Sequence, residues 1–128
     1  MNDEGATPNE LNDTQTVVAL DEARNARTRR PVGFDRRELE TILRLYGRMV
    51  AANEWRDYAI DHTLEGAFFS VYRRASESPL FQIIKNPALA RKQGAWSVVA
   101  SGGQILKRGH ELANVLTVFD KKLKLVGG

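Results

Sequence analysis

The basic side chains between Lys85 and Arg108 are the residues of this chain whose type and spacing suggest chemistry. Two basic pairs bracket an apolar stretch that Ser101-Gly102-Gly103 interrupts. Between residues 66 and 109, seven lysines and arginines stand against one acid. Clustered cations focus positive potential and attract phosphate groups, and a neighbouring tryptophan can stack on a base. The candidate anion-binding residues are Lys85, Arg91, Lys92, Trp96, Lys107 and Arg108.

The same cations also have a simpler interpretation. Exposed strand ends are often basic because lysine and arginine solubilise sheet edges. Tryptophan is more often a core or boundary residue than a stacking platform. The chain contains neither the aromatic motif of the RRM nor a KH G-x-x-G loop. The pattern therefore leaves open whether these residues form a site or a solvated edge.

Residues for catalysis or metal binding do not form a recognisable motif. His62 and His110 lack metal-ligand spacing, and Asp57 and Asp61 lie two intervals of about 6.8 Å apart on a strand, too far for a carboxylate pair. No serine has a nucleophile-elbow context, and there is no phosphate-binding P-loop. With no cysteine, thiolate chemistry and disulfides are excluded. We expect a non-enzymatic protein with no catalytic residue, no metal and no cofactor.

The bulk composition indicates one soluble domain with a tail. The chain has 128 residues, of which 42% are hydrophobic and 27% charged, with a net charge of +3. Its first 22 residues carry six acids and no lysine or arginine, and the nine residues that follow carry four arginines. We expect residues 1–31 to be a disordered tail and residues 32–126 to form a single domain. The absence of cysteine, of a signal peptide and of a membrane-spanning apolar run favours the cytoplasm and no membrane contact.

A helix from Asp35 to about Asn53 is the clearest local signal. Asp35 followed by Glu38 predicts a capping box, with Asp in the role of Ser or Thr. Apolar residues then recur with helical spacing. They are Leu39, Ile42, Leu43, Tyr46, Met49 and Val50.

Period-two segments predict about five strands after this helix. We expect strands over residues 55–62, 67–74, 80–85, 96–100 and 104–108. A three-residue loop at Ser101-Gly102-Gly103 would set Val98 opposite Leu106 on the core face and Ser97 opposite Lys107 on the outer face. A final helix is expected from about His110, with one apolar face formed by Leu112, Val115, Leu116 and Phe119.

The predicted fold is α+β: an antiparallel meander sheet of about five strands flanked by an N-terminal and a C-terminal helix. The middle strands are apolar on both sides, for example with Phe68, Tyr72, Leu80 and Ile84 on the second side. Both faces must therefore be covered. We expect the final helix to cover the second face, and the alternative is that this face meets another chain.

Several separate segments carry a resemblance to a known family. They are "FDRRELETILRLYGRMVAANEWRDYAID", "FSVYRRASESPLFQIIKNP", "ARKQG" and "GQILKRGHELANVL". From Phe34 to Val126 the chain resembles an uncharacterised alphaproteobacterial family catalogued only as a domain of unknown function. The resemblance implies a bacterial cytoplasmic source, and it implies no activity, ligand or catalytic residue.

We therefore predict a non-enzymatic binding protein with a basic rim for an anionic partner, for which nucleic acid is the first candidate. The rim is formed by Lys85, Arg91, Lys92, Lys107 and Arg108, which we expect to surround the connection between the third and fourth strands. The alternative is a protein–protein adaptor or a homodimeric regulatory protein that uses the second apolar sheet face. A pull-down with and without nuclease would separate these two hypotheses.

Overall fold

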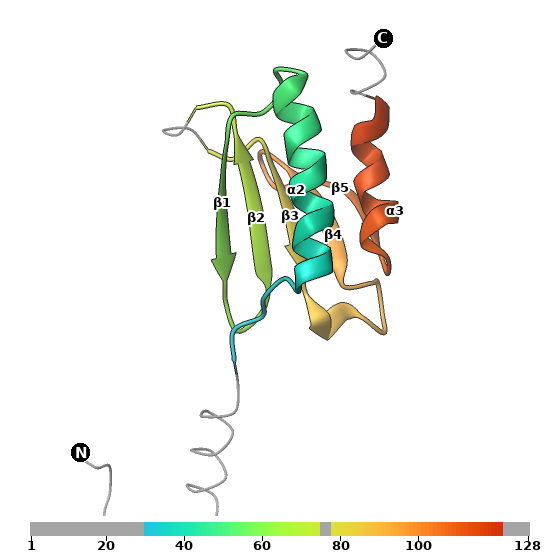
Figure 1. The fold of residues 1–128 in the computed structure, drawn as a ribbon. Helices are drawn as coiled ribbons and strands as arrows, with labels where there is room; N and C mark the ends of the chain where they lie inside the picture. Colours follow the sequence, from blue (N-terminus) through green and yellow to red (C-terminus); the bar gives the residue numbers. More distant parts are fainter. Residues whose placement is uncertain (1–29, 75–77, 122–128) are drawn as a thin grey trace, which may run out of the picture. The chain divides into compact units, whose positions relative to one another are not determined.

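The structure, a computed structural model, describes residues 30–74 and 78–121 (Figure 1). Apart from Arg30 and Pro31, the predicted disordered tail lies outside the described residues. The elements, in chain order, are α2 (Arg36–Ala51), β1 (Asp57–His62), β2 (Ala67–Tyr72), β3 (Phe81–Lys85), the 3-10 turn η2 (Pro87–Leu89), β4 (Trp96–Ala100), β5 (Ile105–Gly109), α3 (Leu112–Leu116) and η3 (Thr117–Phe119).

Helix α2 begins at the predicted capping box. The Glu38 backbone N–H donates to the Asp35 carboxylate, and the Asp35 N–H donates to the Glu38 carboxylate, both at 2.8 Å. The buried stripe is Ile42, Leu45 and Met49. The sequence pattern missed Leu45 and wrongly included Val50, which is exposed. Because α2 has neighbours on one side only, three residues per two turns are enough to fill its contact with the core.

The five strands form one antiparallel sheet in the order β1-β2-β3-β4-β5. This confirms the predicted α+β meander with a helix before and a helix after it. The first strand begins at Asp57, two residues later than expected at Trp55. Trp55 belongs to the core instead, where its ring meets Phe119 edge-on at 5.1 Å between centroids.

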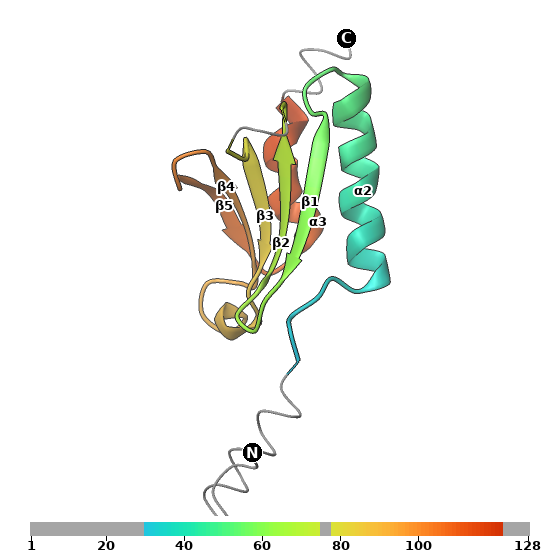
Figure 2. The same cartoon turned by 90° about the vertical axis from the view of Figure 1, so that its left-hand side faces the viewer.

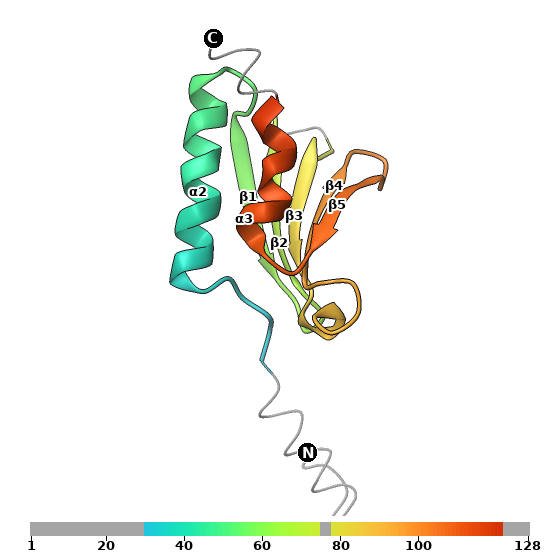
Figure 3. The ribbon, with the colours of Figure 1, turned by 90° about the vertical axis from the view of Figure 1, so that its right-hand side faces the viewer.

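Both helices lie on the same face of the sheet (Figures 2 and 3). The expectation that the final helix covers the second face is therefore wrong. Only His110 and Glu111 separate β5 from α3, and the apolar side of the α3–η3 segment packs into the core that α2 already shares. Phe119 illustrates this, because its ring lies 5.1 Å from both Trp55 and Phe81. We call the sheet face opposite the helices the outer face.

The β4–β5 hairpin differs from the expected register. Its loop has the expected three residues, since the Ala100 N–H donates to the Gln104 carbonyl, and Gly102 and Gly103 both have φ of +92°. A β-bulge between Val98 and Val99 then adds one residue to β5. As a result Lys107 lies opposite Val98, and Arg108 lies opposite Ser97. The predicted pairs Val98–Leu106 and Ser97–Lys107 are therefore wrong.

Candidate binding surfaces

The strand register places all residues of the predicted basic rim at one end of the sheet. Lys85 ends β3, Trp96 begins β4, and their Cα atoms are paired. Trp96 is also paired with Gly109 at the end of β5, next to Arg108. The structure nevertheless divides these residues between the two faces of the sheet, and it gives each one a different environment.

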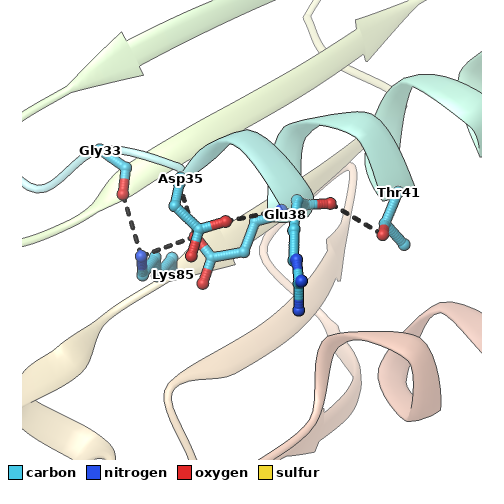
Figure 4. Close-up of polar contacts among 6 residues, drawn as sticks. Gly33, Asp35, Glu38, Thr41 and Lys85 are labelled. Carbon is cyan, nitrogen blue, oxygen red and sulfur yellow. Dashed lines mark hydrogen bonds and ion pairs between the residues drawn. The ribbon is translucent and has the colours of Figure 1, made fainter.

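Lys85 lies on the helix side and is held by α2 (Figure 4). Its ammonium donates to the Glu38 carboxylate at 2.7 Å and to the Gly33 carbonyl at 3.0 Å. The two charged side chains are only 20% and 21% exposed. Glu38 thus caps α2 and neutralises Lys85 with the same carboxylate, so Lys85 is bound internally and does not present a free charge to an anion.

Trp96 is a core residue. It is 6% exposed, and its ring stacks on Phe34 with 6.0 Å between centroids and 12° between planes. The Lys85 ammonium lies 5.8 Å from the Trp96 ring, on the helix side of the sheet. In this arrangement Trp96 has no exposed ring face on which a base could stack, as its predicted role would require.

Lys107 and Arg108 point to opposite faces because they are neighbours on one strand. The Lys107 ammonium donates to the Thr117 hydroxyl at 3.0 Å, on the helix side. The Arg108 guanidinium donates to the side-chain carbonyl of Gln93, which belongs to the loop that precedes β4. The bulge in β5 therefore decides which of these two cations faces the outer surface.

Arg91 and Lys92 are exposed on that same loop. Gly94 allows this loop to lie directly against β5. Its φ is +98°, and a Cβ at this position would lie 2.2 Å from the carbonyl carbon of Gly109, so only glycine fits there. Of the predicted anion-binding residues, Arg91, Lys92 and Arg108 are thus the exposed cations that lie together. Binding of an anion by these three residues stays a prediction.

The outer face has an acidic edge and a basic edge. One row across the sheet runs Asp61, Phe68, Ile84, Ser97 and Arg108 through successive pairs of the register. The next row on this face runs Ala59, Ser70, Gln82, Val99 and Ile105. Asp57 adds a second acid at the β1 edge. Between the edges, the residues are apolar or polar without charge.

The outer face is exposed at its β5 edge and hollowed at one end, while its middle residues are partly buried by their neighbours on the sheet. Ile105 is 48% exposed, although it is a large aliphatic residue. A hollow of about 160 Å³ lies beside the β4–β5 loop and is lined by Ser78, Pro79, Gln82, Val99, Ala100, Ser101, Gly102 and Gly103. Within the described ranges, both helices pack on the far side of the sheet and leave this face uncovered.

Sequence reasoning missed a second group of cations, on α2. Arg37, Arg44 and Arg48 are exposed and follow each other at intervals of seven and four residues. This spacing places them along one side of a helix. The spacing of these arginines is visible in the sequence, on the side of the helix that flanks its buried stripe.

The remaining titratable candidates have structural surroundings. His62 is exposed, and its ring meets Phe34 edge-on at 6.2 Å. Tyr46 donates a hydrogen bond to the Arg56 carbonyl. Burial first, then the Asp57 carboxylate and Tyr58, raises the pKa of Tyr46 above its ordinary value of 10.0. Among residues 30–74 and 78–121 there is no cluster of three metal-ligating side chains, and no helix there has the length and apolarity to cross a bilayer.

Comparison with known proteins gives one family match. The family model described as "Protein of unknown function (DUF2794)" matches residues 32–116. The chain belongs to this family. The match confirms the resemblance to a domain of unknown function that the sequence motifs indicated. Searches among curated proteins and among solved structures find no match.

The DUF2794 match runs from the residues just before α2 to the end of α3. It therefore includes the whole sheet, the basic rim and the arginines of α2. The outer face and both groups of exposed cations are parts of the DUF2794 domain itself.

Proposed function

We propose that this DUF2794 protein is a cytoplasmic, non-enzymatic binding protein that forms a homodimer through its outer sheet face. The observation that carries the proposal is the placement of both helices on one face, which leaves the other face of a five-stranded sheet open. Apolar sheet faces are normally covered by another layer. A second copy of the chain is the occupant that its charge pattern favours.

The charge pattern selects one arrangement of the two copies. When two identical faces meet, the twofold axis lies in the interface, either along the strands or across them. An axis along β3 sets the β1 edge of one copy against the β5 edge of the other. Asp61 would then face Arg108, because these two residues lie in the same row of the sheet. An axis across the strands would instead set the acidic β1 edges against each other.

The shape of the face agrees with the axis along β3. Tyr72 lies on β2 at the end of the sheet where Leu80 and Ser101 are joined by a backbone hydrogen bond. The hollow lined by Ser101 and Val99 lies at that same end, on the other side of β3. Rotation about β3 therefore brings Tyr72 of each copy opposite the hollow of the other. The strands of two stacked sheets cross at about −30°, so residues close to the twofold axis stay nearest to the positions expected for parallel alignment.

The interface is small, which sets the expected affinity. Five strands at about 4.8 Å spacing and five residues at about 3.3 Å each give a face of about 19 Å by 17 Å. The two copies together would bury about 650 Å² of flat area, which is below the roughly 1,000 Å² of a stable specific interface, so we expect a weak, transient dimer with a dissociation constant on the order of 100 µM.

Sedimentation equilibrium from about 1 µM to about 500 µM tests the proposal directly. The wild-type chain should pass from monomer to dimer across this range. Asp61→Arg and Arg108→Asp should each remain monomeric alone, because like charges then face each other. An equimolar mixture of the two variants should dimerise, since each contact regains opposite charges. Asp120→Arg, a charge reversal on the helix side, should behave as wild type. A wild-type chain that stays monomeric throughout would refute the homodimer.

An anionic partner is the second candidate, with nucleic acid first among anions. It is supported by the exposure of Arg91, Lys92 and Arg108 at one corner of the sheet. Because Arg108 is used in both proposals, an anion at this corner should compete with self-association. Loss of oligonucleotide binding in an Arg91→Gln, Lys92→Gln variant would place the anion at this corner and not in the groove described below, and unchanged binding would remove this candidate.

A further inference from the structure

We infer that the groove between α2 and α3 is a binding site for the phosphate backbone of nucleic acid. The groove lies on the helix side, where Figure 3 shows the two helices next to each other in front of the sheet. It has a volume of about 200 Å³ and is lined by Thr41 and Arg48 from α2 and by Ala113, Leu116, Thr117 and Asp120 from the α3–η3 segment. It is separate from the outer face and from Arg91 and Lys92.

One wall of the groove is formed by α2, which carries a row of three arginines on that side. Arg37, Arg44 and Arg48 share one side of α2 with Thr41, and Thr41 and Arg48 line the groove. At 1.5 Å rise per residue the row extends over about 16 Å. In the part of the chain that the structure describes, none of the three arginines forms an ion pair. Their guanidinium groups are therefore available to a ligand.

Two of the arginines repel each other along the helix. Arg44 and Arg48 are four residues apart, and like charges at this spacing destabilise a helix. Glu40, four residues before Arg44, pairs instead with Arg36 at 3.6 Å. A bound polyanion would remove the repulsion between the arginines.

The opposite wall adds positive charge. The Lys107 ammonium bonds to the hydroxyl of Thr117, which itself lines the groove. Asp120 is the acid among the lining residues. Arg48 and Asp120 are the charged residues that line the groove, Lys107 bonds to the lining Thr117, and Arg37 and Arg44 continue the row of arginines along α2.

The chemistry of the lining identifies the class of ligand. Arginine binds phosphate oxygens with its planar fork, and a row of arginines fits a chain of phosphates better than one compact anion. The lining residues include no aromatic side chain on which a base could stack. We therefore expect contacts to the backbone alone, with strong dependence on salt and little dependence on base sequence.

Fluorescence anisotropy with a labelled thymidine oligonucleotide, about 20 nucleotides long, tests this site at several salt concentrations. Replacing Arg44 and Arg48 by Gln should weaken binding about 25-fold at 0.1 M salt and lower the slope of log K against log salt by about 1.4, because two phosphate contacts are lost. A mixed-sequence oligonucleotide should bind like the thymidine one. Circular dichroism should show that this exposed double variant folds normally.

The matched control is Arg91→Gln, Lys92→Gln, which removes the same charge from the other basic group. It should bind within about twofold of wild type if the groove is the site. Three results would overturn the inference: no wild-type binding at low salt, equal losses in the two double variants, or competition by polyglutamate as strong as that by unlabelled oligonucleotide. The last result would assign the groove to an acidic protein segment. A monomeric wild-type chain would refute the homodimer without affecting this test.

Discussion

Replacement of Lys85 by Met tests whether this residue is a structural cation or a binding residue. The ammonium makes a charge-assisted hydrogen bond to Glu38, a bond to the Gly33 carbonyl and a cation–π contact with Trp96. Their typical contributions are about 1.5–3, 1 and 0.5–1 kcal/mol. Removing the charge also removes its desolvation cost, and Met retains the packing of the stem. We expect a net loss of about 2–3 kcal/mol in the free energy of unfolding.

Urea unfolding followed by tryptophan fluorescence measures this loss. All variants are compared at one protein concentration, because self-association adds to apparent stability. A double-mutant cycle with Glu38→Gln should give a coupling of about 1 kcal/mol or more. Lys92→Met, at an exposed lysine, is the control and should stay within about 0.5 kcal/mol of wild type. A Lys85→Met loss as small as that of the control, with no coupling to Glu38, would refute the reasoning and return Lys85 to the anion-binding residues.

Three further predictions concern single contacts, each measured by urea unfolding. Asp35→Ala should cost about 0.5–2 kcal/mol, because the Glu38 N–H loses its acceptor; no loss would place the helix start elsewhere. Gly94→Ala should cost about 3 kcal/mol or more, since the new Cβ would meet the Gly109 backbone. Gly102→Ala is the control: it also has a positive φ but open space around it, so it should cost about 1–2 kcal/mol. Equal losses would contradict the close approach of Gly94 to the Gly109 backbone. Tyr46→Phe should cost about 1 kcal/mol at neutral pH. The folded state raises the pKa of Tyr46, so the contribution of Tyr46 to the free energy of unfolding is fully present below pH 10.0. It is lost as the pH rises from 10.0 through the higher pKa of the folded state. The free energy of unfolding of Tyr46→Phe should therefore fall less steeply with alkaline pH than that of the wild type.

Local signals in the sequence were enough to predict the elements of this protein. The capping box at Asp35 and Glu38 depends on residues three apart, so its geometry follows from the helix itself. The same holds for the apolar side of the final helix, where Leu112, Val115 and Phe119 are buried. Alternating segments joined by short connections also predicted a meander, because consecutive strands with short loops pair with each other.

Contacts between distant residues decided the candidate sites. The sequence placed Lys85 in a basic rim, and only the packing of α2 on the sheet brings Glu38, 47 positions away, to its ammonium. Which side of the sheet a strand residue faces depends on the strand register. The single bulge opposite Val98 and Val99 shifts that register by one residue, so Lys107 faces the helices and Arg108 faces the outer surface, the reverse of the expectation.

The layer arrangement was beyond the sequence for a similar reason. Apolar residues on both sides of β2 and β3 require cover, but periodicity does not say which helix supplies it. The final helix packs on the face that α2 already occupies, because Phe119 joins Trp55 in the core on that side. The sequence by itself determined which segments are helix and strand. Tertiary packing decided which face stays open and which cations remain free, because both depend on side chains that meet only in the folded chain.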